Sequence, residues 1–302
     1  MSTLRTLCVT LICFGATRAA AQRETDQPVL AAKAATPTVS LRIYNPVGKV
    51  RVVAWNRDSV VVRGRVADRD KFFFGGSGEG MKLGVEGPEN AVKLGVDPAS
   101  PTGLARVSDF VVYVPTASKV WVRTVSASID AVGASGSFYT VSGPIHLSGT
   151  ASSIEAESMN GSLDLDVTTP WLRARTGDGH LLLRGAPQDV DVSTISGTLD
   201  IATTTPLRAQ FSSVSGDIHY VASPARGAIF EFSNHSGNVD MVLPESVSGA
   251  FMLSSITGAI QNGFTRVRPA ASTPNSLRLT LGNGGSSVTV RTYKGAIRLR
   301  PE

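Results

Sequence analysis

Short segments with alternating apolar and polar residues recur along the C-terminal two thirds of the chain. The clearest segment, TVSGPIHL, runs from Thr140 to Leu147. Its relatives share a Ser or Thr, an apolar residue, a small polar residue and a glycine, followed by two apolar residues that flank one polar residue. The glycine position holds Ala127, Gly143, Gly161, Gly179, Gly197, Gly216, Gly237 and Gly258, so the period is 16 to 21 residues. A period this short is typical of a repeat protein.

Alignment of the copies on the glycine position sorts the apolar residues into columns. The second residue after the glycine is always aliphatic, and the fourth is apolar in every copy but the last. This period of two predicts a β-strand after each glycine. The fifth residue before the glycine is also apolar, which predicts a second strand leading into the turn. The first of these columns contains Ile129, Ile145, Leu163, Leu181, Leu199, Ile218, Val239 and Ile260.

One repeat is too short to bury its own apolar face, so neighbouring copies must stack to form a continuous core. We therefore predict an all-β, single-stranded parallel β-solenoid (β-helix) with rungs of 16–21 residues, capped by an irregular N-terminal β region. Leucine-rich repeats have a similar period, but they require an LxxLxLxxN run and a helix. The Gly, Ser, Thr and β-branched residues of this chain favour strands instead.

The regions outside the central repeats divide the chain further. Residues 22–38 lack periodicity, which predicts a flexible leader. We predict an N-terminal β region and cap over residues 39–119. Residues 120–302 should form solenoid repeats that continue to the C-terminal cap. Gly48 marks a first rung with a hairpin over residues 39–66. Asn275 and Gly295 continue the glycine series, and GNGG at 282–285 predicts a turn between two paired strands. The irregular ends should cover the exposed strand edges.

Residues 1–21 have the features of a secretory signal peptide, with a basic residue, a short apolar run and small residues before Gln22. Export to the periplasm, the cell surface or the extracellular space is therefore expected, without a transmembrane segment. Cys8 and Cys13 both lie within the predicted signal. The mature chain then has no thiol, which excludes disulfides and Cys-based zinc sites.

Charge is distributed unevenly along the chain. Residues 22–124 carry 15 Lys/Arg against 10 Asp/Glu, residues 125–262 carry 5 against 13, and residues 263–302 carry 7 against 1. The central repeats are therefore acidic between two basic ends. An exported protein whose longest regular surface is acidic would repel phosphate, so we expect no nucleic-acid partner.

Acidic and histidine side chains recur at the third position after the glycine. We identify six of these residues as a candidate lateral binding stripe: Asp130, His146, Asp164, Asp200, His219 and Asp240. Each histidine should lie between aspartates on adjacent rungs, about 4.8 Å apart. A metal or a sugar is one use of such a stripe, and a solvated face with spaced charges is the alternative. His180 and His235 fall outside this column without an obvious partner. We assign no catalytic residue, metal ligand or cofactor.

The serial VSG-x-I-x-L units, the signal peptide and the element at Val114 and Pro115 resemble a family of uncharacterised exported bacterial proteins, the "putative adhesins", and the related head-domain proteins. The resemblance covers roughly residues 38–300 and implies a parallel β-solenoid, with no established ligand residues to transfer.

Three functions remain open on this basis. The first is a monomeric, non-enzymatic adhesin-like binding or structural protein of the cell envelope, with a cell-surface, envelope or glycan partner. The alternative is a carbohydrate-active β-helix enzyme, a polysaccharide lyase or hydrolase, for which Asp164 with Asp166 and Asp189 with Asp191 are candidate acid pairs. The third is an envelope component without a ligand.

Overall fold

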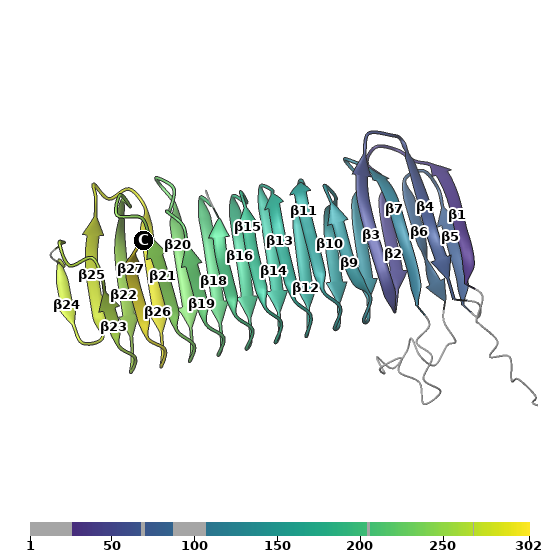
Figure 1. Cartoon of the computed structure of the whole chain (residues 1–302). Helices are drawn as coiled ribbons and strands as arrows, with labels where there is room; N and C mark the ends of the chain where they lie inside the picture. Colours follow the sequence, from purple (N-terminus) through teal and green to yellow (C-terminus); the bar gives the residue numbers. More distant parts are fainter. Residues whose placement is uncertain (1–25, 68–69, 87–106, 204–205, 268) are drawn as a thin grey trace, which may run out of the picture.

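The computed structural model describes residues 26–67, 70–86, 107–203, 206–267 and 269–302. Over these ranges the chain is entirely β-structure and turns, and it forms a long rod of stacked strands (Figure 1). The predicted signal peptide, residues 1–21, lies outside the described residues. In the part of the chain that is described, no helix has the length and apolar character needed to cross a membrane.

The strands form two long sheets that face each other along the rod. Sheet A contains, in spatial order, β1 (Gln27–Ala34), β4 (Ser59–Val66), β7 (Ser108–Pro115), β3 (Gly48–Trp55), β9 (Ser128–Val132), β11 (Ile145–Thr150), β13 (Leu163–Thr168), β15 (Leu181–Gly185), β17 (Leu199–Thr203), β19 (Ile218–Val221), β21 (Val239–Leu243), β27 (Ile297–Pro301) and β23 (Ile260–Asn262). Sheet B contains β24 (Ala271–Thr273), β25 (Ser276–Leu281), β22 (Gly249–Ser255), β26 (Ser287–Thr292), β20 (Ile229–Asn234), β18 (Arg208–Ser213), β16 (Asp189–Thr194), β14 (Trp171–Thr176), β12 (Ile154–Ser158), β10 (Ser135–Thr140), β8 (Lys119–Thr124), β2 (Ser40–Asn45), β6 (Gly80–Glu86) and β5 (Lys71–Gly76).

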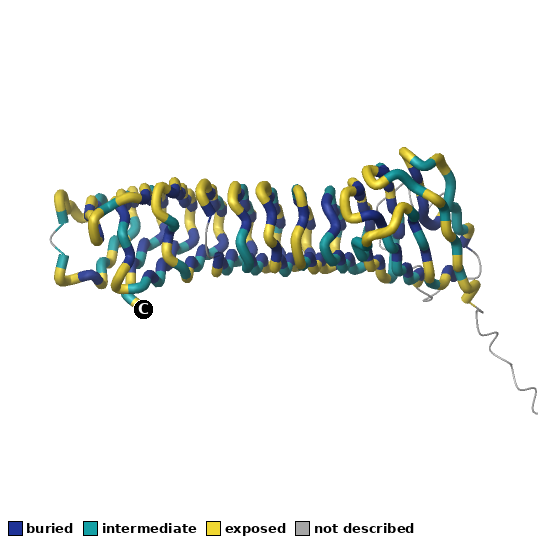
Figure 2. Tube along the Cα trace, turned by 90° about the horizontal axis from the view of Figure 1, so that it is seen from above, coloured by how far each residue is buried: buried dark blue, intermediate teal, exposed yellow. Residues whose placement is uncertain are grey.

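Each central rung contributes one strand to each sheet and pairs in parallel with its neighbours. Ile145 is in register with Ile129 on one side and Leu163 on the other, as the alignment on glycine predicts. These side chains are buried, and buried positions alternate with more exposed ones along most strands of the central rungs (Figure 2). The predicted parallel β-solenoid is confirmed, and its core is the space between the two sheets.

The glycine column exists because adjacent rungs approach closely at this corner. A Cβ atom built on Gly179 would overlap the backbone carbonyl oxygen of Gly161 on the preceding rung. The hydroxyl three residues earlier completes the corner: the Gly179 N–H donates to Thr176 Oγ1 at 3.1 Å, and the Gly197 N–H to Thr194 Oγ1 at 3.0 Å. Thr194 Oγ1 in turn donates to the Gly177 carbonyl at 3.0 Å. The buried Ser/Thr ladder therefore satisfies backbone groups within and between rungs.

The N-terminal end departs from sequence order. The rung of β2 and β3 contacts β8 and β9, whereas the rung of β6 and β7 lies outside it. The predicted hairpin over residues 39–66 is wrong in its pairing, because β7 lies between β3 and β4. The predicted flexible leader is also wrong for residues 27–34, since β1 pairs antiparallel with β4 and covers the outer edge of sheet A. Without β1, the edge of β4 would offer unpaired backbone groups, and these give residues 27–34 their partner.

The C-terminal end uses the same arrangement. The last rung of the chain, β26 and β27, lies between the rung of β20 and β21 and the rung of β22 and β23. The predicted pairing across GNGG at 282–285 is therefore wrong, because β22 separates β25 from β26. Asn275 does not open a further parallel rung either, since β25 runs antiparallel to β22. At both ends the chain leaves one rung position empty and continues into antiparallel strands beyond it. A later pair of strands then returns to occupy the empty position.

Candidate functional site

The predicted stripe forms a column on the outer face of sheet A that is interrupted only by Leu182, between Asp164 and Asp200. It is called here the Asp/His column (Asp130, His146, Asp164, Asp200, His219 and Asp240). His146 is in register with Asp130 and Asp164, and His219 is in register with Asp200 and Asp240. His146 Nδ1 lies 3.4 Å from Asp164 Oδ2, and His219 Nδ1 lies 3.6 Å from Asp240 Oδ2. The predicted order of the column is confirmed; whether it binds a ligand stays a prediction.

Basic residues outside the predicted column pair with its aspartates. Arg184 Nη2 lies 2.7 Å from Asp164 Oδ1, and Arg51 Nε lies 4.0 Å from Asp130 Oδ2. His180, expected to lack a partner, instead places Nε2 2.6 Å from Asp200 Oδ2. His180 belongs to the turn before β15. The column was defined from strand positions only, so it did not include turn residues such as this one. His235 also has a partner, because its ring stacks on Tyr293 with the centroids 4.9 Å apart.

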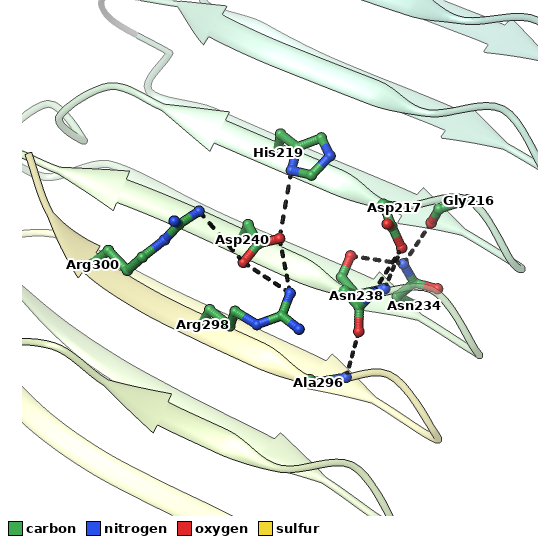
Figure 3. Close-up of polar contacts among 9 residues, drawn as sticks. All are labelled: Gly216, Asp217, His219, Asn234, Asn238, Asp240, Ala296, Arg298 and Arg300. Carbon is green, nitrogen blue, oxygen red and sulfur yellow. Dashed lines mark hydrogen bonds and ion pairs between the residues drawn. The ribbon is translucent and has the colours of Figure 1, made fainter.

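The column ends at Asp240, where the C-terminal rung is clamped to its neighbour (Figure 3). Arg298 Nη1 on β27 lies 3.2 Å from Asp240 Oδ2, and Arg300 Nη2 lies 3.8 Å from Asp240 Oδ1. The Asp240 side chain is only 10 % exposed, against 40 % for Asp200. A carboxylate this buried is stabilised by several cationic partners, which favours a structural role at this end of the column.

A second polar ladder runs beside Asp240 and joins the same three rungs (Figure 3). Asp217 Oδ1 accepts from the Asn238 backbone N–H at 2.7 Å and from Asn238 Nδ2 at 3.2 Å. Asn238 Oδ1 then accepts from the Ala296 N–H on the last rung at 3.1 Å. The order of these contacts follows the spatial order of the rungs and not the order of the chain.

Asp240→Asn should lower the free energy of unfolding by about 1–3 kcal/mol, because it removes the charge that His219, Arg298 and Arg300 share in a largely buried position. Asp200→Asn is the matched control, and its cost should stay within about 0.5 kcal/mol because that ion pair is solvated. Urea denaturation of both variants measures the difference. Equal losses would contradict the clamping role of Asp240.

One acid of each pair proposed for glycoside chemistry is engaged in ion pairs. Asp164 contacts Arg184 and His146, as described above, and Asp191 Oδ2 lies 3.2 Å from Arg173 Nε and 3.9 Å from Arg175 Nη2. Over the described ranges, no three His, Cys, Asp or Glu residues cluster in a way that would hold a metal ion.

A groove on the opposite sheet was missed by the sequence reasoning. It lies on the outer face of sheet B near its N-terminal end, has a volume of about 470 Å³, and is called here the cationic groove. Its side chains come from β2, β5, β6 and β8: Arg42, Tyr44, Phe73, Lys82, Trp121 and Arg123. The alternation of buried and outward residues is visible in the sequence at LRIY (41–44), MKLG (81–84) and VWVR (120–123). The sequence does not show that these segments are neighbours, because that depends on the spatial order of β6, β2 and β8.

Comparison with known proteins reveals one family and several similar folds. A sequence model of the Toastrack DUF4097 family matches residues 105–300. A crystal structure of a putative adhesin from Parabacteroides distasonis is similar with a TM-score of 0.51 and 9% identity, over 91% of this chain and 98% of that one. A putative adhesin from Bacteroides fragilis gives a TM-score of 0.47 and 10% identity, again over 91% and 98% of the two chains. No curated protein matches the chain.

Proposed function

The chain belongs to the Toastrack DUF4097 family, and from that premise we propose that it is a non-enzymatic, exported β-solenoid that binds a partner at the cell surface, in the envelope or outside the cell. The observation that carries this proposal is the geometry of the two outer sheet faces. In-register stacking places outward side chains in straight columns over the whole rod. Rigid repeated faces of this kind suit the recognition of an extended partner.

The chemistry of the acids supports binding rather than catalysis. Asp164 and Asp191 are paired with Arg184 and Arg173, so one acid of each candidate pair is already engaged by a cation of the protein. The signal-like sequence of residues 1–21 supports export. The name of the similar Parabacteroides distasonis structure, a putative adhesin, agrees with a surface role.

Purified mature protein tests the proposal in two parallel assays. We expect saturable binding to a glycan array or to intact bacterial cells, and no release of reducing ends or unsaturated products from polysaccharides. Depolymerisation that is lost on Asp164→Asn or Asp191→Asn would replace the binding function with the enzymatic alternative. Absence of binding to any glycan or cell surface would contradict the adhesin-like function.

A further inference from the structure

The cationic groove contains like charges placed side by side. Arg42 on β2 is in register with Lys82 on β6, and both point outward from sheet B. Like charges directly opposite each other on neighbouring strands destabilise a sheet. Arg123 on β8 adds a third cation. It lies two residues after Trp121, the register partner of Arg42, and is itself in register with Tyr44. Such an arrangement gains stability when an anion binds to it.

The other arginines on this face show what a paired arrangement looks like. Arg173 and Arg175 on β14 both lie within ion-pair distance of Asp191 on the next rung. Within the described ranges, Arg42, Lys82 and Arg123 make no ion pair with any carboxylate, whereas Arg51 and Arg65 on the opposite sheet are both paired with aspartates. The groove therefore brings three cations without ion pairs together around one hollow of this face.

Two glycines lie beside Phe73, which lines one side of the groove. Gly84 is in register with Tyr44 on one side and Phe73 on the other, and a Cβ atom there would overlap the Tyr44 carbonyl oxygen, so glycine allows the close approach of β6 to β2. Gly75 is in register with Lys82, and nothing lies within 4 Å of the position that a Cβ would take there. The Phe72–Phe74 and GGSGEG run thus places one outward ring, Phe73, on the groove and leaves open space at Gly75 next to it.

Aromatic rings line the groove next to the cations. Trp121 is in register with Arg42 and is 36 % exposed, so part of its indole is open to a ligand. Partial burial raises the pKa of Tyr44, which keeps its hydroxyl protonated and able to donate a hydrogen bond. Open aromatic rings beside cations suit a ligand that has apolar ring faces as well as negative charges.

We propose that the cationic groove binds an acidic polysaccharide, whose carboxylate or sulfate groups pair with Arg42, Lys82 and Arg123 while a sugar ring stacks on Trp121. This inference rests on the proposed binding function and names its partner class. A phosphate polymer fits less well because Glu155 and Glu157 follow on β12, two strands beyond β8, and limit the length of the positive surface.

Binding of the mature protein to polygalacturonate and to dextran sulfate, with neutral dextran as a control, tests the groove. We expect wild-type binding to one or both acidic polymers that weakens with salt, and a dissociation constant about tenfold higher in the double variant Arg42→Ala/Lys82→Ala. Arg173→Ala is the matched control, because it removes a paired cation from the same face. Its dissociation constant should stay within about twofold of the wild type.

A second pair of variants separates stacking from charge. Trp121→Ala should weaken binding about tenfold, whereas Trp171→Ala should leave it unchanged. Both tryptophans are 36 % exposed on sheet B, but Trp171 lies on β14 beneath Arg173, whose guanidinium is 5.4 Å from its ring centroid. Circular dichroism checks that all variants keep the wild-type strand signal.

Other ligands define the outcomes that overturn the inference. Equal losses in groove and control variants, or tighter groove-dependent binding to oligo-dT or to phosphatidylglycerol vesicles than to either acidic polysaccharide, would contradict it. Glycan-array or cell binding that survives in Arg42→Ala/Lys82→Ala would also overturn the groove assignment, while the proposed adhesin-like function would stand. A different result would contradict the adhesin-like function itself: wild-type protein that binds no glycan and no cell.

Discussion

A chain that lacks residues 276–302 should self-associate instead of forming a soluble monomer. The deletion removes β25, β26 and β27, and with them seven buried apolar side chains: Leu277, Leu279, Leu281, Val288, Val290, Ile297 and Leu299. At about 1.5–3 kcal/mol for each side chain, their burial contributes roughly 10–20 kcal/mol. That is comparable with the whole stability of a typical domain, about 5–15 kcal/mol.

The loss is topological as well as energetic. Without β26 and β27, a gap one rung wide separates β20 and β21 from β22 and β23. If the gap stays open, four strand edges are exposed, and if it closes, the outer edge of β22 has lost its cover, β25. Exposed edges template intermolecular pairing in both cases.

Size-exclusion chromatography with light scattering measures the effect. A shorter deletion of residues 287–302 is the control, because it keeps β25 over β22, and it should aggregate less than the longer deletion. A monomeric protein of native thermal stability from the 276–302 deletion would refute the capping role of the C-terminal segment.

Leu181→Asp should abolish the native fold or cost more than about 4 kcal/mol of unfolding free energy. Leu181 is fully buried and in register with Leu163 and Leu199, so the new carboxylate would lie in the apolar core without a partner. Desolvation of an unpaired charge adds to the apolar contacts that are lost.

The next residue offers a matched control for this substitution. Leu182 is half-buried on the outer face of sheet A, in register with Asp164 and Asp200. Leu182→Asp places the same carboxylate among other acids but within reach of solvent, so it should cost only about 1 kcal/mol. Thermal and urea unfolding followed by circular dichroism compares the two. Similar losses would contradict the assignment of inner and outer faces.

The central rungs were predictable because their constraint is local. Each glycine, hydroxyl and aliphatic position recurs with the corner of the rung, so alignment alone reproduces the observed register of Ile145 with Leu163. The order of acids and histidines in the column followed from the same alignment. Because the rungs stack in register, residues at equivalent positions of successive repeats become neighbours in space.

The ends and the ion pairs were not predictable in this way. Strand alternation identifies β4 and β25 but does not say which strand lies beside them, because the same pattern fits parallel and antiparallel partners. Arg184 and His180 approach the column from neighbouring positions, where no repeat distinguishes them. The cationic groove depends on β6 lying beside β2, which the order of the chain does not indicate.

At both ends of the rod, rungs that are neighbours in space are far apart in the sequence, and this affects the order in which the parts of the rod can fold. Within the central rungs, contacts such as Arg173 to Asp191 close loops of 18 residues, whereas Asn45 to Ser108 and Asp240 to Arg298 close loops of 63 and 58. Longer loops lose more entropy on closure and form later. The middle of the rod should therefore nucleate and propagate outward, and β26 and β27 should dock only after β22 and β23 have left a place for them. Residues 287–302 then hold β22 and β23 to the central rungs, so their release should limit the rate at which the rod unfolds from this end.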